Sequence, residues 1–287
     1  RLIKHFADVP FRLACTATPA PNDIEELTNQ AEFLGVSTRV NMLSAYFVHD
    51  SDGWRMKGHA RRPMFRWMTS WAVALRSPAD LGYDATDYVL PGLDIRAHLL
   101  DVDATPDGQL FATDLGGVGG RAAVRRATLA ARCAKAAELV AADPDEPWLI
   151  WCGLNDEATM LAKLIPGAVN VHGSWTPEDK AAALLGFADG SIRTLITKPS
   201  IAAFGLNWQH CARMVFVGLS DSYEAYYQAI RRCYRYGQQR VVEAHIVLSE
   251  LEGQIASNVA RKERDASHIT SGLVAEMRAA GELGRAQ

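Results

Sequence analysis

The stretch around which this sequence is organised is DSYEAYYQAIRRCYRYGQ, residues 221–238. Asp221 and Glu224 have the three-residue spacing of a capping box, in which two side chains satisfy backbone N–H groups at the start of a helix. We therefore predict that a helix begins at Asp221.

One face of this predicted helix combines an amide with two guanidinium groups. Gln228, Arg232 and Arg235 follow one another at intervals of four and three residues, which places them on the same side of a helix. Arginine offers fixed forks of N–H donors that match phosphate oxygens better than the point charge of lysine does. The pattern predicts an anion-binding face, although a solvated basic face or ordinary salt bridges would produce the same arginine spacing.

Length and composition are those of a globular protein. The chain has 287 residues, of which 48% are hydrophobic and 22% charged, enough for one large or two smaller domains. The net charge is −3 and the pI is near 6.3, so any contact with nucleic acid must come from local patches. No apolar run approaches the ~18 residues that span a bilayer. We expect a cytoplasmic location, or the host cytoplasm for a phage protein.

The cysteines give no sign of a disulfide framework or of a zinc site. The sequence has five, and they are scattered without a CxxC pair or a histidine at zinc-ligand spacing. We expect reduced thiols and no structural metal.

The second half of the chain has the pattern of a parallel α/β sheet. Short apolar runs alternate there with helical patterns, after a long Ala-, Arg- and Leu-rich helix predicted over 120–142. The predicted strands are 148–151, 168–171, 194–197, 214–217 and 241–248. Ligands of open α/β sheets bind outside the carboxyl ends of the strands, where the intervening loops carry polar residues.

Two stretches, in the correct order, resemble motifs of one enzyme family. QAIRRCYRYGQ, residues 228–238, resembles motif VI of the superfamily 2 helicases, in the QAxxRxxRxGQ form of the SNF2 family of DNA translocases. CTATPAPNDIEELTNQAEFLGV, residues 15–36, is similar to the motif III segment LTGTPxxNxxxELxxxxxFL. Without the family, residues 11–36 indicate only a short strand over 11–15, a proline turn and an amphipathic helix. The resemblance covers residues 11–35 and 146–250.

The resemblance implies that the chain is the C-terminal half of such a protein, with a RecA-like parallel sheet flanked by helices. The sequence contains neither a GxxxxGK loop ending in Ser or Thr nor a credible DExx box, and it begins at Arg1, so we expect the first nucleotide-binding lobe to be absent and the chain alone to be inactive. The expected parts are 1–40, the end of the first lobe with motif III; 41–115, an irregular and mainly helical insertion; 116–250, the second RecA-like domain; and 251–287, a helical brace.

The resemblance also implies roles for individual residues. Arg235 would be the arginine finger, Arg232 would bind the γ-phosphate, and Gln228 would orient the helix or the cleft. Gly205 and Asn207 would line the nucleotide site, because the segment resembles the motif V pattern TKxGGxGLN. ATP and Mg²⁺ are the implied cofactors, and the missing lobe would hold most of both.

DNA is the implied partner, contacted without sequence specificity and most naturally as a duplex. The residues expected to contact it are Thr16 and Thr18 in motif III, His172, Gly173, Ser174 and Lys180 in a Gly-Ser turn and the helix after it, Thr197 and Lys198 in motif V, and Arg61 and Arg62 in the insertion. The last two lie in a stretch, 54–76, that contains six basic residues, interleaved aromatic residues and no acidic residue. There are two alternatives. One is a plain turn and cap at 172–174, and the other is packing of the tryptophans of 54–76 in a helix with an apolar stripe over 64–75.

The sequence also departs from the family pattern. Residues 199–204 replace the paired glycines of motif V, and Lys180 stands where arginine is usual. These departures indicate a divergent branch, such as one carried by phages or mobile elements.

The leading hypothesis is an ATP-dependent SNF2-like DNA helicase or translocase. The alternative is a non-catalytic module that binds nucleic acid or docks to a subunit. A Rossmann-like transferase is disfavoured, because the sequence has no GxGxxG after a strand.

Overall fold

A computed structural model of the chain describes residues 2–51, 53–101, 124–203, 205–220 and 222–285. The chain divides into two compact units, Arg1–Tyr88 with Ala260–Gln287, and Val89–Val259.

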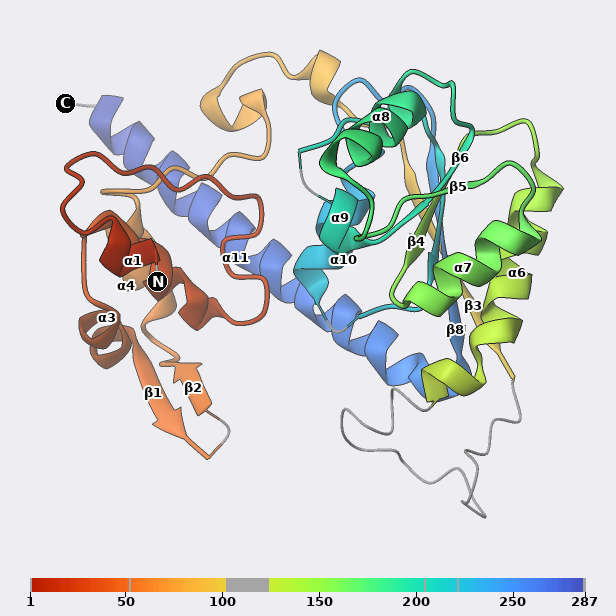
Figure 1. Cartoon of the computed structure of the whole chain (residues 1–287). Helices are drawn as coiled ribbons and strands as arrows, with labels where there is room; N and C mark the ends of the chain where they lie inside the picture. Colours follow the sequence, from red (N-terminus) through yellow and green to blue (C-terminus); the bar gives the residue numbers. More distant parts are fainter. Residues whose placement is uncertain (1, 52, 102–123, 204, 221, 286–287) are drawn as a thin grey trace. The chain divides into compact units, whose positions relative to one another are not determined.

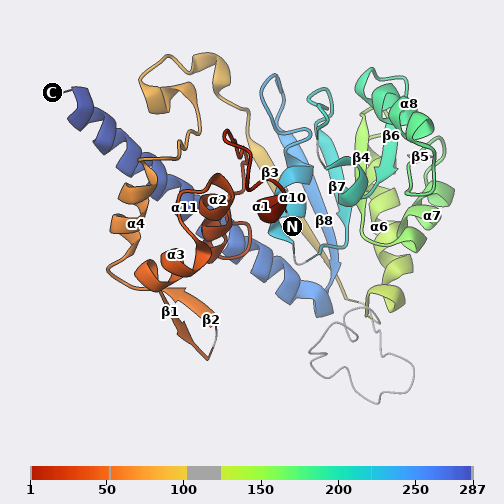
Figure 2. The same ribbon diagram turned by 60° about the vertical axis from the view of Figure 1, so that its left-hand side comes forward.

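The second unit is built on a six-stranded sheet in the order β3-β8-β7-β4-β6-β5, with every neighbouring pair parallel (Figures 1 and 2). The strands are β3 Leu93–Leu100, β4 Trp148–Cys152, β5 Val169–Asn170, β6 Thr194–Thr197, β7 Arg213–Val217 and β8 Val242–Ser249. The register places Ile150 of β4 opposite Ile196 of β6 and Val215 of β7. All the carboxyl ends therefore lie at one edge of the sheet.

Helices cover both faces of this sheet. Figure 1 has α6 and α7 on one side and α8, α9 and α10 on the other. The helical segments are α6 Leu129–Ala142, α7 Asn155–Leu164, α8 Pro177–Ala188, α9 Pro199–Ala202, α10 Tyr223–Ile230 and the 3₁₀ turn η4 Glu250–Glu252. Helices on both faces are what parallel sheets require, because the crossover connections must pass above or below the strands.

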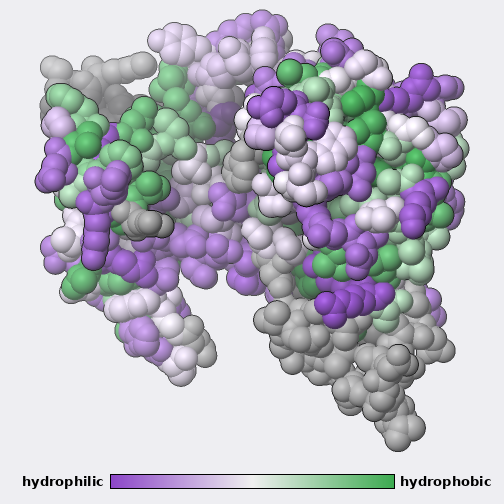
Figure 3. Space-filling model, in the orientation of Figure 1, coloured by the Kyte–Doolittle hydropathy of each residue, from purple (hydrophilic) through white to green (hydrophobic). Residues whose placement is uncertain are grey.

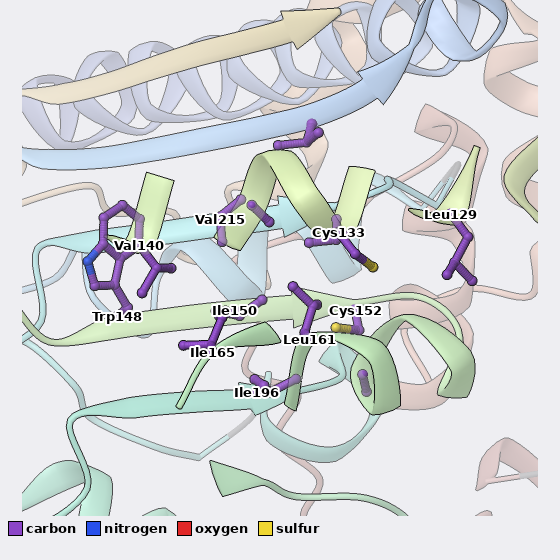
Figure 4. Packing of buried hydrophobic residues seen from close by; sticks show 14 residues of the cluster. Leu129, Cys133, Val140, Trp148, Ile150, Cys152, Leu161, Ile165, Ile196 and Val215 are labelled. Carbon is purple, nitrogen blue, oxygen red and sulfur yellow. The ribbon is translucent and has the colours of Figure 1, made fainter. Parts of the chain in front are cut away.

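β4 is the centre of the core, since all five of its residues are buried. Successive side chains of a strand point to opposite faces. Ile150 and Cys152 pack with residues of α6 and α7 in one cluster (Figure 4). Trp151, on the other face, lies 6.3 Å from the Trp208 ring and 6.4 Å from the Phe216 ring. The continuous apolar sequence of this strand follows from burial on both sides.

The five strands predicted from apolar runs are confirmed, with shifts of at most one residue at each end. The segment 41–115 was expected to be irregular and mainly helical, and this was wrong for β3, which pairs with β8 along its whole length. β3 is an edge strand with several exposed positions, including Arg96, so it lacks the apolar run that identified the other strands.

The start of α10 also differs from the prediction. Ser222 caps the helix, its hydroxyl accepting from the backbone N–H of Ala225 at 3.2 Å, while Asp221 lies outside the described residues. The regular helix ends at Ile230, so Arg232 and Arg235 lie in the turns that follow it.

The first unit has its own small core. Residues of α2, α3 and α4 pack there with Ile269 and Leu273 of the long helix α11. The expected strand over 11–15 is not formed, and the predicted apolar helix stripe over 64–75 ends with α4 at Met68. The elements are α1 Leu2–His5, η1 Ile24–Glu26, α2 Leu27–Leu34, α3 Arg39–Tyr46, the antiparallel strands β1 Phe47–Asp50 and β2 Gly53–Met56, α4 Arg61–Met68, η2 Pro78–Leu81, η3 Thr86–Tyr88 and α11 Gly253–Arg285.

The surface is mixed in polarity. Figure 3 has hydrophilic side chains interspersed with hydrophobic ones over the displayed face of the second unit. Within the described ranges, no helix combines the length and the hydropathy that crossing a bilayer requires.

Candidate functional site

The segment after α10 is irregular but tightly held. Gly237 has φ +90°, a left-handed conformation that favours glycine. The next side chain, the buried amide of Gln238, donates to the carbonyls of Cys211 and Cys233 and accepts from the backbone N–H of Arg240 at 2.9 Å. One glutamine therefore anchors both ends of the turn that carries Arg235.

Arg232 is the best-anchored side chain of the segment. It is only 7% exposed, and its Nε donates to the Gln228 carbonyl at 3.0 Å. Its Nη2 also donates to the side-chain oxygen of Gln228 at 3.3 Å. Its Nη1 donates to the Leu206 carbonyl at 2.8 Å. The arrangement brings Gln228 and Arg232 together although the regular helix does not extend to both.

Arg235 meets the same acceptor. Its Nη1 donates to the Leu206 carbonyl at 3.0 Å, so one backbone oxygen receives a donor from each arginine. Trp208, which is fully buried, donates its backbone N–H to the Arg232 carbonyl at 2.8 Å and fixes the two segments against each other. The loop after α9 and the turn after α10 therefore form one structure.

Neither arginine has a negatively charged partner among the residues that the structure describes. Burial lowers the pKa of Arg232 from its usual value, and the neighbouring Arg235 charge lowers it further. Buried charges in proteins are normally paired, because an unpaired charge loses its hydration without compensation. Two uncompensated guanidinium groups beside each other are suited to an anion that carries more than one charge.

Gly205 and Asn207, which the sequence assigns to the nucleotide site, flank Leu206. Gly205 has φ +75° and is exposed, and Asn207 is exposed as well. The structure thus brings together all five residues predicted for catalysis and nucleotide binding. The sequence did not predict the Leu206 carbonyl as the acceptor shared by Arg232 and Arg235, because every residue has a backbone carbonyl and residue identity does not indicate which one is used.

The turn between β5 and α8 is ordered by its own side chains. The indole N–H of Trp175 donates to His172 Nε2 at 2.8 Å, and His172 Nδ1 lies 2.8 Å from the Ser174 hydroxyl. Since an indole nitrogen can only donate, Nε2 accepts, and in a neutral ring the proton lies on Nδ1 facing Ser174. The Lys180 ammonium donates to the Gly173 carbonyl at 2.7 Å. Gly173 and Ser174 remain exposed at this preformed turn.

Thr197 and Lys198, at the carboxyl end of β6, have different environments. Thr197 is fully buried, and its hydroxyl donates to the Val171 carbonyl at 3.4 Å. Its side chain therefore offers no surface to DNA and holds two strand ends together. Lys198 is partly exposed and precedes α9, and its ammonium group has no hydrogen bond or ion pair within the described residues.

The remaining predicted DNA contacts belong to the first unit. The Thr16 hydroxyl accepts from the backbone N–H of Thr18 at 3.0 Å; Thr16 is exposed and Thr18 is buried. Arg61 is exposed on α4, whereas Arg62 forms an ion pair with Glu276 at 2.9 Å. The surface ion pair with Glu276 explains the position of the Arg62 side chain without a DNA contact.

Residues 132–237 match the family described as the helicase conserved C-terminal domain. The match covers less than half of the chain. It includes β4 to β7 and the group of Leu206, Gln228, Arg232 and Arg235, whereas β3, β8 and Gln238 lie outside it. The six-stranded parallel sheet of the second unit, flanked by helices, is the RecA-like fold that the sequence predicts. No curated protein matches the chain.

Two solved structures are similar to parts of the chain. The C-terminal part of the Fun30 ATPase domain is 16% identical over 50% of this chain and 54% of that one, with a TM-score of 0.41. The RNA-helicase Prp28 from Chaetomium thermophilum, solved bound to ADP, is 17% identical over 61% of this chain and 37% of that one, with a TM-score of 0.44. The match therefore spans about half of the first structure and just over a third of the second.

Proposed function

We propose that the chain is the C-terminal part of an ATP-dependent SNF2-like DNA helicase or translocase. The helicase C-terminal domain would supply arginines to ATP held chiefly by another lobe. The observation that carries the proposal is the convergence of Arg232 and Arg235 on the Leu206 carbonyl without a carboxylate partner among the described residues.

The two arginines would divide the work according to how they are held. Arg232 is buried and already donates to three oxygens, so it would set the position of the site and contribute charge to the γ-phosphate. Arg235 is more exposed and uses one N–H group in its hydrogen bond to the Leu206 carbonyl, which leaves most of its five N–H groups for a phosphate. Arg235 would be the arginine finger, and Gln228 would orient Arg232.

ATP would supply the phosphoanhydride bond whose hydrolysis drives movement. Transfer of a phosphoryl group depends mainly on positioning and on cationic stabilisation of the charge on its oxygens. The uncompensated guanidinium groups of Arg232 and Arg235 fit that requirement. Among the described residues, no three His, Cys, Asp or Glu side chains gather closely enough to hold a metal ion, so we assign no residue of this chain to Mg²⁺.

Contacts with DNA would come from the preformed turn at 172–174 and from Lys198. A Gly-Ser turn at the start of a helix can offer N–H groups to a backbone phosphate, and phosphate contacts carry no base information. Lys180 would contribute through the two ammonium protons that the Gly173 carbonyl does not use. Movement along DNA would then require no sequence recognition.

The test is DNA-stimulated ATP hydrolysis by the complete protein that carries this chain, with Arg235→Ala. We expect the turnover number to fall by a factor on the order of 10³, because a finger acts on transition-state charge. The matched control is Arg193→Ala, which removes an exposed arginine paired with Asp145. Undiminished hydrolysis by Arg235→Ala would refute the assigned role.

The same assay tests the alternative hypothesis, in which the chain is a non-catalytic module. If the complete protein does not hydrolyse ATP with or without DNA, while the 287-residue chain binds DNA, the helicase C-terminal domain serves binding alone.

A further inference from the structure

Arg231 lies next to the catalytic candidates and has an unusual environment. Its guanidinium carbon lies over the Tyr227 ring at 5.1 Å and over the Tyr234 ring at 5.2 Å. The Tyr227 ring in turn lies 5.7 Å from that of Tyr223, so three aromatic rings and one cation form a continuous row from the start of α10 to the turn that follows it. Tyr227 lies four residues before Arg231 and Tyr234 three residues after it, so the arrangement is local.

The aromatic contacts hold the cation but do not satisfy its hydrogen bonds. Cation–π attraction acts between the charge and the face of a ring, whereas guanidinium N–H groups point outward in their own plane. The one hydrogen bond from this side chain among the described residues is a long one, 3.4 Å from Nη1 to the Tyr234 carbonyl. Nε and Nη2 have no partner there, and the residue is partly exposed.

The local charge is also uncompensated. No carboxylate of the described residues forms an ion pair with Arg231, Arg232 or Arg235, although ion pairs are common elsewhere in the unit. A helix turn with three arginines and no counter-charge attracts anions. A guanidinium held between rings, with in-plane donors left over, has the fork geometry that binds one phosphate through two parallel N–H groups.

We infer that Arg231, braced by Tyr227 and Tyr234, is a phosphate-binding residue distinct from the Arg232 and Arg235 pair. The rings restrict the rotamers of the long side chain, so less conformational entropy is lost when the phosphate binds. The phosphate belongs either to a nucleic-acid backbone or to a nucleotide. The choice between these two sources rests on the proposed function, but binding of phosphate by Arg231 does not require hydrolysis.

The experiment measures binding by the 287-residue chain to two probes: a short fluorescent DNA duplex at several salt concentrations, and ATP in competition with a fluorescent analogue. Arg231→Gln removes the charge, and Arg231→Lys keeps the charge but loses the fork. Tyr234→Leu removes one ring of the brace, whereas Tyr234→Phe retains it. Arg193→Gln is the matched control for loss of one positive charge on the same unit.

We expect Arg231→Gln to weaken binding of one probe about tenfold or more, with Arg231→Lys and Tyr234→Leu intermediate and Tyr234→Phe close to the unaltered chain. A loss confined to the duplex, with a salt slope reduced by about 1, identifies a backbone phosphate. A loss confined to ATP identifies the nucleotide.

Two results would overturn the inference. One is that Arg231→Gln binds both probes as Arg193→Gln does, and the other is that the unaltered chain binds neither probe. Hydrolysis by Arg235→Ala is a separate readout, so failure of the arginine finger and failure of the Arg231 site can be told apart.

Discussion

At the scale of single residues, a buried ion pair joins two helices of the second unit. Arg132 of α6 and Glu157 of α7 are both fully buried, and their charged groups are 2.7 Å apart. Glu157 also accepts from the backbone N–H groups of Gly153 and Leu154, each at 2.8 Å, at the carboxyl end of β4. The carboxylate therefore ties the start of α7 to α6 and to the sheet edge.

Removal of one partner from this pair should destabilise the protein strongly. We expect Arg132→Met to lower the free energy of unfolding by about 3–5 kcal/mol, because the Glu157 carboxylate stays buried after the guanidinium beside it is removed. Glu157→Gln should cost less, because the buried Glu252 carboxylate still lies 3.7 Å from Arg132 Nε. Denaturant unfolding measures the change. The control Lys135→Met breaks an exposed pair with Glu138 and should cost less than about 1 kcal/mol. Equal losses of stability in Arg132→Met and Lys135→Met would contradict the argument.

Two histidines give the second unit a pH dependence. Nε2 of His98 on β3 lies 2.9 Å from Nδ1 of His245 on β8. Burial, with Lys135 and Arg96 nearby, lowers the pKa of His98 from its usual value of 6.5. Burial, followed by the charges of His98 and Arg96, lowers the pKa of His245. Both rings are therefore neutral in the folded protein at neutral pH.

The sign of the effect on stability follows. Below about pH 6.5 the unfolded chain binds protons that the folded chain resists, so stability should fall as the pH decreases through that value. We expect the double replacement His98→Gln with His245→Gln to flatten this dependence in thermal melting between about pH 7.5 and pH 5. The replacement of exposed His5 by Gln is the control. An unchanged slope in the double variant would exclude the pair as its source.

At the scale of elements, the turn after α10 shows what the spacing of arginines could and could not predict. The spacing places Gln228, Arg232 and Arg235 together, and the structure brings them together. The cause differs, since the regular helix stops at Ile230 and tertiary hydrogen bonds to Leu206 and from Trp208 align the arginines. A helical repeat predicts proximity along one face, but it cannot predict an acceptor that a distant loop supplies.

That turn depends on Gly237. At φ +90° a side chain is strained, although an added Cβ would meet only Gln209 at an ordinary 3.5 Å. We therefore expect Gly237→Ala to lower the free energy of unfolding by about 1–2 kcal/mol through backbone strain alone. In the complete protein it should also reduce ATP turnover, because the segment that carries Arg235 would shift. The control Gly173→Ala has open space and no positive φ. Equal melting temperatures for both variants would contradict the prediction.

The strands differ in how readily they can be predicted from the sequence. β4 is buried on both faces and reads as an unbroken apolar run, WLIWC. β3, at the sheet edge, has exposed positions and includes Arg96 and His98, so no simple periodicity marks it. Its place became evident only from its pairing with β8.

At the scale of the whole molecule, the division into units follows contacts and not sequence order. The first unit combines residues from both ends of the chain, because Ile269 and Leu273 of α11 complete its core. The second unit begins at Val89, before β3, and β3 pairs with β8 from near the other end of that unit. The partner of a segment is a long-range property that local composition does not report.

The parallel α/β class of the second unit, the positions of most strands and the grouping of residues at the arginine site follow from the sequence alone, because burial on both faces and motif spacing are local signals. Three features emerge only when the chain is folded: the Leu206 carbonyl joins the two arginines, Thr197 is buried, and Arg231 lies between two tyrosines without a counter-charge among the described residues. Each of these features depends on groups that meet only in the folded chain. Neither the backbone carbonyl of Leu206 nor the absence of a carboxylate beside Arg231 among the described residues can be predicted from residue identities alone.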